Sequence, residues 1–185
     1  DPNPVIMLEN EVLYGQTFEV PRDPDVTVPI GKAKVVKEGS DVSIVAFSIM
    51  VGKALEASDL LSNAGIEAEV IDLRTIRPLD VETIITSVKK TNRIVTVEQG
   101  WPTCGIGAEI SSLVGEEAFD FLDAPVKRVA GVDVPMPYAA NLEKLALPQT
   151  SDIVSAAKAV CYRGYGERNA DPYPNASPFS HNDGG

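Results

Sequence analysis

The sequence has very little histidine and cysteine, and this scarcity excludes several kinds of chemistry. Its single histidine, His181, lies in a tail rich in glycine, proline and asparagine, so a folded catalytic site built on histidine has no residue to use. The two cysteines, Cys104 and Cys161, are too few for a disulfide framework or a four-thiolate metal site. We therefore expect a protein of a reducing compartment without a histidine-based nucleophile.

Basic residues and long apolar runs are also scarce. The 185 residues include 16 lysines and arginines against 27 aspartates and glutamates, a formal net charge of −11. This acidic excess argues against binding to nucleic acid or to an anionic membrane surface. The longest apolar stretch, 42–51, is interrupted by Ser43 and Ser48 and is shorter than the roughly 20 residues of a membrane span. We expect neither a nucleic-acid partner nor a membrane partner.

Short apolar runs alternate with segments of helical periodicity along most of the chain. Strands are expected at 42–47, 68–73, 94–97 and 126–130, and helices at 51–61, 81–88, 106–114 and 151–162. Gly65 is placed to end the first helix, and Asp80 to cap the second. The alternation predicts an α/β fold, a three-layer sandwich around a mainly parallel sheet of about five strands, with an antiparallel edge strand at 34–37.

Composition divides the chain into four segments. Residues 1–15 contain the apolar run 5–9, which indicates a buried strand at the end of an upstream domain, so the chain is expected to be truncated or processed at its start. The proline-containing stretch 16–33 predicts a linker, and 34–163 the main domain. In 164–185, 14 of the 22 residues are Gly, Pro, Asn, Asp or Ser, a composition typical of a disordered tail.

Two groups of residues have the character of anion-binding sites. Gly105-Ile-Gly107 resembles half of a phosphate-binding turn, but the third glycine is missing and Glu109 brings negative charge to the first helical turn. A tight turn that packs helix on sheet is the better interpretation. Arg74 and Arg77 follow a parallel strand at the edge where such sheets place their sites. They can hold a carboxylate or phosphate, but a structural or interface role is favoured.

The only tryptophan, Trp101, follows another strand and is predicted either to anchor an interface or to pack in the core. The segment 132–138 contains two prolines and is expected to be rigid and extended. A role in binding a partner is favoured for it over a role in catalysis. The acids form no recognisable metal cluster, and no diphosphate-binding motif is present. From its residues the segment is therefore expected to contain no catalytic, cofactor-binding or metal-binding residue.

Several longer motifs resemble one protein family. They are Leu8-Glu-Asn-Glu-Val-Leu-Tyr-Gly15, Ile30-Gly-Lys-Ala-Lys34, Val70-Ile-Asp-Leu-Arg-Thr-Ile-Arg-Pro-Leu79, Lys90-Thr-Asn92, Phe121-Leu-Asp-Ala-Pro125 and the segment 132–140. Over residues 1–163 the chain resembles the beta subunits of mitochondrial pyruvate dehydrogenases. The resemblance implies that 1–15 is the remnant of a thiamine-pyrimidine-binding domain and that 34–163 is a transketolase-type C-terminal domain.

The resemblance also implies an activity and partners. The whole enzyme, a heterotetramer of two alpha and two beta subunits in the mitochondrial matrix, decarboxylates pyruvate oxidatively with thiamine diphosphate and magnesium and acetylates lipoyl-lysine to feed acetyl-CoA formation. Its catalytic and cofactor residues belong to the alpha subunit or to sequence upstream of this segment, which alone is expected to be inactive. The implied partners are the alpha subunit, a second beta subunit and the subunit-binding domain of dihydrolipoyl acetyltransferase.

One residue is assigned a docking role by this resemblance. The acid that aligns with Asp123 faces a basic residue of the subunit-binding domain in the family, so Asp123 is the candidate docking residue. Arg74, Arg77 and Trp101 are candidate interface residues. Two alternatives remain open at this point. One is the beta subunit of a branched-chain 2-oxoacid dehydrogenase, and the other is a free-standing nucleotide- or anion-binding α/β module that uses Gly105, Gly107 and Arg74.

Overall fold

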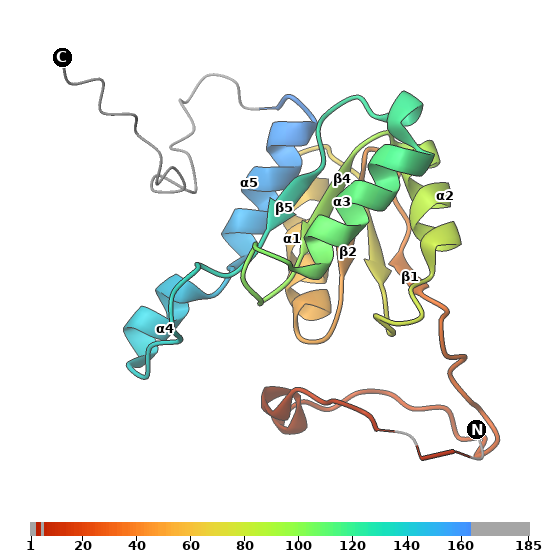
Figure 1. The fold of residues 1–185 in the computed structure, drawn as a ribbon, viewed down its shortest axis with the longest axis vertical. Helices are drawn as coiled ribbons and strands as arrows, with labels where there is room; N and C mark the ends of the chain where they lie inside the picture. Colours follow the sequence, from red (N-terminus) through yellow and green to blue (C-terminus); the bar gives the residue numbers. More distant parts are fainter. Residues whose placement is uncertain (1–2, 5, 164–185) are drawn as a thin grey trace.

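A computed structural model describes residues 3–4 and 6–163, and its centre is a sheet of five strands in the order β1-β3-β2-β4-β5 (Figure 1). The strands are β1 (Lys34–Lys37), β2 (Val42–Ala46), β3 (Ala68–Asp72), β4 (Ile94–Val97) and β5 (Lys127–Val129). The pairings β3–β2, β2–β4 and β4–β5 are parallel, and β1 runs antiparallel to β3 at one edge. The predicted mainly parallel sheet with one antiparallel edge strand is confirmed.

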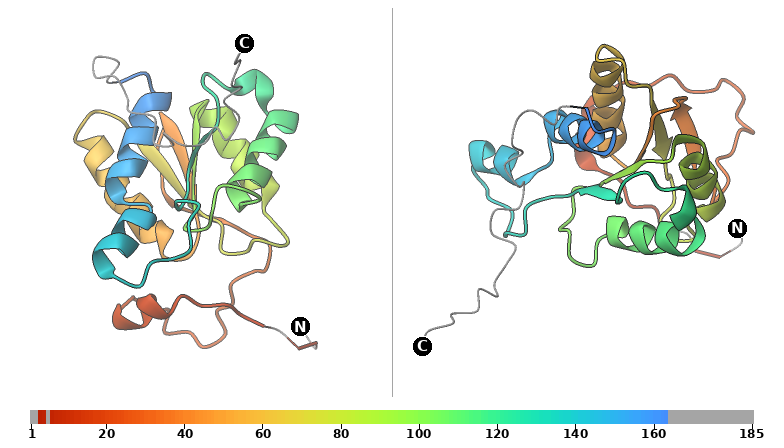
Figure 2. Two further views of the ribbon diagram at one scale, coloured as in Figure 1. Left: turned by 60° about the vertical axis from the view of Figure 1, so that its left-hand side comes forward. Right: turned by 90° about the horizontal axis from the view of Figure 1, so that it is seen from above.

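Helices cover both faces of the sheet and make the three layers (Figure 2). The helical segments of the described chain are η1 (Glu11–Gly15), α1 (Met50–Ser62), α2 (Val81–Thr91), α3 (Ile106–Glu117), η2 (Phe119–Phe121), α4 (Ala140–Ala146) and α5 (Thr150–Val160). One buried cluster packs α1 and α5 on one face, and a second packs α2 and α3 on the other. The strands β2, β3 and β4 contribute to both clusters, which is why they are largely apolar in the sequence.

The strand predicted at 5–9 is wrong for the described residues of that run. Ile6, Met7 and Leu8 are 88%, 78% and 94% exposed and belong to no strand. A strand needs the backbone of a neighbour to complete its hydrogen bonds, and no described segment pairs with this one. The prediction for 164–185 falls outside the described residues.

Asp80 is the N-cap of α2, as predicted, and it also binds the segment that precedes β1. Its carboxylate accepts hydrogen bonds from the Thr83 N–H (3.3 Å), the Thr83 hydroxyl (2.8 Å) and the Ala33 N–H (2.9 Å). Burial raises the pKa of Asp80, but the bonds from Ala33 and Thr83, together with the charge of Lys32, outweigh it, so the pKa lies below its ordinary value. The cap therefore joins residue 33 to α2.

Removal of this cap should measurably destabilise the domain. We expect Asp80→Ala to lower the free energy of unfolding by about 1–2 kcal/mol, measured by chemical denaturation at pH 7, whereas the matched control Glu82→Ala removes a carboxylate that is 84% exposed. Because the folded pKa of Asp80 is lowered, its contribution is complete above the unfolded pKa of about 3.9 and is lost as the pH falls through the folded value. Equal losses in the two variants would contradict this role.

Candidate functional site

The candidate docking residue Asp123 lies between η2 and β5, and its carboxylate is already paired inside the chain. The Arg93 Nη2 atom donates to Asp123 Oδ2 at 2.7 Å. The Asp123 side chain is 52% exposed and that of Arg93 is 25% exposed. Arg93 follows the α2 C-cap, so the pair joins the end of one helix to the loop before the edge strand. A partner that approaches Asp123 therefore meets a carboxylate that has a cation beside it.

The backbone around Asp123 is held by contacts that do not involve Arg93. The Asp123 N–H donates to the Asn92 carbonyl at 2.9 Å, and the Asn92 Nδ2 atom donates to the Phe121 carbonyl at 2.9 Å. The Tyr162 hydroxyl donates to the Asp123 carbonyl at 2.8 Å. Asn92 can return to the loop in this way because it adopts the left-handed conformation, with φ of 60°. Asp123 is thus an exposed carboxylate on a fixed loop.

A small pocket of about 140 Å³ lies beside this pair, at the end of the sheet where the parallel strands begin. Its lining is formed by Asp41, Gly65, Ile66, Arg93, Cys161 and Arg163. Burial raises the pKa of the Cys161 thiol, and Arg93 and Arg163 oppose that rise only in part. The thiol is therefore protonated at neutral pH and is not an activated nucleophile.

The candidate interface residues Arg74 and Arg77 lie at the opposite end of the sheet from Asp123. Both follow the end of β3 and are exposed. Arg74 adopts a left-handed conformation with φ of 57°, and its N–H donates to Asp72 Oδ1 at 3.0 Å. The structure therefore separates the sequence-predicted residues into two surfaces, with Asp123 on one and the arginines on the other.

Trp101 lies at the same end of the sheet as Arg74, after β4, and is not in the core. It is 53% exposed, and its Nε1 atom donates to the Val134 carbonyl at 3.2 Å. This bond ties the tryptophan to the rigid segment 132–138. Further exposed apolar side chains in that segment and in α4 are Val132, Val134, Met136, Tyr138, Leu142 and Leu145. We call these residues, with Trp101, the Trp101 surface.

The turn Gly105-Ile-Gly107 opens α3 as predicted, but an internal carboxylate occupies its N–H groups. Glu98, only 4% exposed, accepts from the Ile106 N–H at 3.0 Å and from the Gly107 N–H at 2.9 Å. A carboxylate at this position satisfies the free donors of the helix and its positive end. The turn has no such donors left for a phosphate, so the free-standing anion-binding alternative loses its strongest feature.

Close packing against Glu98 also explains both glycines of the turn. A Cβ at residue 105 would lie 2.5 Å from Glu98 Oε1, and one at residue 107 would lie 2.5 Å from Thr96 Oγ1. A diphosphate therefore does not fit this turn. Among the residues that the structure describes, no group of three or more histidines, cysteines and acids is placed to hold a metal ion.

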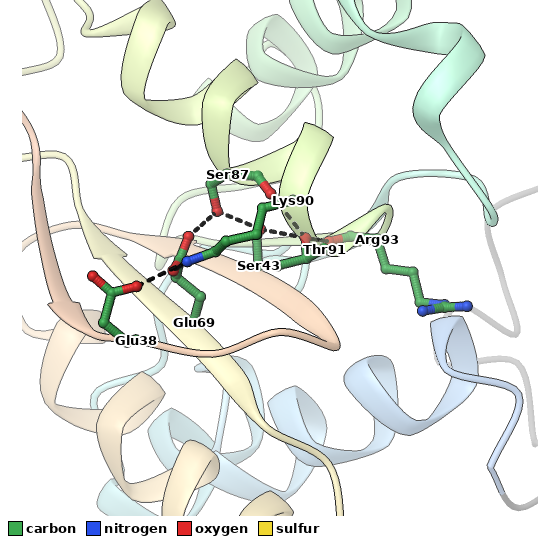
Figure 3. Close-up of polar contacts among 7 residues, drawn as sticks. All are labelled: Glu38, Ser43, Glu69, Ser87, Lys90, Thr91 and Arg93. Carbon is green, nitrogen blue, oxygen red and sulfur yellow. Dashed lines mark hydrogen bonds and ion pairs between the residues drawn. The ribbon is translucent and has the colours of Figure 1, made fainter.

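A chain of polar side chains runs beneath α2 and ends at Arg93 (Figure 3). Glu69, in β3, has a side chain that is 2% exposed and pairs with Lys90, which also binds Glu38 at 2.8 Å. Hydrogen bonds continue from Glu69 to Ser87 and, through Ser43 and Thr91, to the carbonyl of Arg93. The distances along that path are 2.5, 2.5, 2.7 and 3.0 Å.

This polar chain fixes the C-terminal end of α2 on the sheet and so fixes the backbone of Arg93. The pKa of Lys90 lies above its ordinary value because Glu38 and Glu69 hydrogen-bond to its ammonium group, so Lys90 stays charged. The roles of Arg93, Glu98 and Glu69 were not predicted from the sequence. One sequence signal pointed to Glu98. It is an acidic residue that directly follows a strand and precedes the glycine turn at the start of α3.

Comparison with known protein families shows the class of domain to which this chain belongs. Residues 31–153 match the model of the transketolase C-terminal domain family, and the chain belongs to that family. A solved split-gene transketolase, described as an inactive beta4 tetramer, is 33% identical with a TM-score of 0.66, over 77% of this chain and 46% of that chain.

The sequence relatives are more specific. The chain is 61% identical over 166 residues to the mitochondrial pyruvate dehydrogenase E1 component subunit beta-2 of Oryza sativa subsp. japonica, covering 88% of this chain and 44% of the rice protein. It is 60% identical over 162 residues to the pyruvate dehydrogenase E1 component subunit beta of Rickettsia felis, with 88% and 49% covered. The chain thus spans a little under half of the length of these curated relatives. No helix in the described part is long and apolar enough to cross a membrane.

Proposed function

We propose that this chain is the C-terminal part of a pyruvate dehydrogenase beta subunit and that it serves assembly and docking. The observation that carries the proposal is identity near 60% to such subunits over 88% of the chain. The same relatives favour pyruvate over branched-chain 2-oxoacids. The whole enzyme would decarboxylate pyruvate and acetylate lipoyl-lysine, which supplies acetyl-CoA formation.

The catalytic groups and cofactors are proposed to lie outside this segment. Thiamine diphosphate and magnesium would be bound by the assembled enzyme, because the described residues offer no fitting cradle at the turn after β4. The isolated segment is therefore proposed to be inactive. The mitochondrial matrix is the proposed location, which agrees with mitochondrial relatives in rice and Dictyostelium discoideum, although close bacterial relatives also occur.

We propose the domain division 1–15, 16–33, 34–163 and 164–185 on two observations. The family match begins at residue 31, close to the proposed start of the main domain. Most of residues 16–30 is exposed and lies outside any helix or strand, which suits a linker.

The Trp101 surface is proposed to meet a second beta subunit or the alpha subunit, with Arg74 and Arg77 beside it. It gathers large exposed apolar side chains with a tryptophan, a combination typical of the buried part of interfaces. Its position after the parallel strands separates it from Asp123, so assembly and docking would use different ends of the domain. The beta4 tetramer of the related split-gene transketolase supports pairing between copies.

Asp123 is proposed to bind a basic residue of the acetyltransferase subunit-binding domain. We expect Asp123→Asn, in the full-length beta subunit assembled with its alpha subunit, to weaken that binding by about 1 kcal/mol, and by several if the contact excludes water. Titration calorimetry with the isolated subunit-binding domain measures it. Asp120→Asn is the matched control, because Asp120 is also exposed and lies in η2, directly before the loop that carries Asp123. Equal affinity of the Asp123 variant and the unchanged protein would refute the docking role.

A further inference from the structure

Arg93 lies beside the exposed Asp123 carboxylate, which is the group that a partner's cation would contact. Its Nη2 atom donates to Oδ2 of the Asp123 carboxylate at 2.7 Å. A basic side chain must therefore share the carboxylate with Arg93 or displace it. Sharing brings two like charges close together, and displacement breaks the Arg93–Asp123 ion pair, so either case costs free energy.

Arg93 is not needed to place Asp123. The loop is held through the Asp123 N–H, the Asp123 carbonyl and the Phe121 carbonyl, in bonds with Asn92 and Tyr162. With the backbone fixed on both sides, the carboxylate stays at the surface when its cation is removed. The main effect of Arg93 on Asp123 is thus to neutralise its charge.

The backbone of Arg93 is also fixed, and its side chain makes one further, longer contact. Its carbonyl accepts from the Ser43 N–H at 2.8 Å and from the Thr91 hydroxyl at 3.0 Å, and its Nη1 atom donates to the Asp41 carbonyl at 3.4 Å. Its Nε atom is buried and has no hydrogen-bond partner in the described part of the chain. An unsatisfied buried donor is unfavourable for stability, so this arginine carries a cost that its contacts with Asp41 and Asp123 must offset.

We propose that Arg93 is a specificity-determining residue of the docking site, an internal cation that competes with the partner for Asp123. The inference rests on the proposed docking role of Asp123. Arg93 weakens the binding of any single basic side chain and so keeps docking reversible. A partner that also presents an acid toward Arg93 is favoured over one that presents only positive charge, because that acid recovers the contact which Arg93 gives up.

The test is a double-mutant cycle on the assembled full-length subunit, titrated with the isolated subunit-binding domain. Arg93→Gln should tighten binding by about threefold to tenfold at low salt and by less at high salt, as expected for one partly screened charge. Arg93→Lys keeps the charge and should stay within about twofold of the unchanged protein. Lys34→Gln removes an exposed positive charge at the opposite edge of the sheet and should have no comparable effect.

Repeating the Arg93→Gln substitution in the Asp123→Asn variant shows whether its effect on binding acts through Asp123. Competition predicts that Arg93→Gln no longer tightens binding once Asp123 is neutral. If Arg93→Gln weakens binding or leaves it unchanged while Asp123→Asn still weakens it, the competition is refuted and the docking role of Asp123 stands. If Asp123→Asn has no effect, both fail. Arg93→Met, whose apolar chain suits the partly buried site, repeats the cycle if thermal melting shows that the glutamine variant is unfolded.

Discussion

Replacement of Glu98 by alanine should lower the free energy of unfolding by about 2–4 kcal/mol. The carboxylate is 4% exposed and accepts both the Ile106 and the Gly107 N–H groups. Its removal leaves two donors at the start of α3 without an acceptor, in a place that water reaches poorly because Gly107 is buried. The loss should appear in chemical denaturation of the full chain.

Two variants test whether the charge and its position matter. Glu98→Gln keeps the shape and one acceptor oxygen, so we expect it to lose about half as much stability as alanine. Glu109→Ala removes an exposed acid from the first turn of the same helix and should cost less than about 1 kcal/mol. Moderate concentrations of phosphate should raise the melting temperature of Glu98→Ala more than that of the unchanged protein, because the freed helix end can bind an anion. Identical losses for Glu98→Ala and Glu109→Ala would contradict the anchoring role.

The sheet and four of its helices could be predicted because their signals are local. Apolar runs such as 42–46 and helical spacing such as Val81, Ile84, Ile85 and Val88 report burial directly, and Asp80 reports a helix start. Helix α4 was missed because only Ala146 in it is buried, so it has no apolar stripe that faces a core. For the described residues 6–9 the strand prediction was wrong, because an apolar run does not reveal whether a neighbouring strand is available.

The site was predictable only in part, for a related reason. Asp123 was proposed from its resemblance to a family, and its exposure agrees with a contact residue. Its partner Arg93 lies 30 positions away, and no local spacing connects the two. The glycine turn was correctly interpreted as packing, but the reason offered, repulsion by Glu109, is secondary. The acid that fills the turn, Glu98, lies 8 positions before Ile106, outside the motif.

Replacement of Glu69 by alanine is expected to destabilise the protein by about 2–4 kcal/mol. Its side chain is 2% exposed and pairs with Lys90 and with the Ser87 hydroxyl. Only the glutamate of this pair is buried, since the Lys90 side chain is 44% exposed, but loss of the glutamate leaves polar groups that were arranged for it. The buried Ser87 hydroxyl, which also bonds to the Ser43 hydroxyl, would then lack the carboxylate that accepts its hydrogen bond. The cavity left by the glutamate side chain would lower the stability further.

Glu38→Ala is the matched control, because Glu38 binds the same lysine from the surface with a side chain that is 78% exposed. An exposed pair of this kind contributes about 1 kcal/mol or less and weakens with salt, whereas the loss for Glu69→Ala should be almost independent of salt. The polar chain from Glu69 ends at the Arg93 carbonyl, so Glu69→Ala should also speed amide hydrogen exchange in the turn 91–93. Unchanged exchange there, together with equal losses in the two variants, would show that α2 is fixed by its apolar face alone and that the docking loop does not depend on this network.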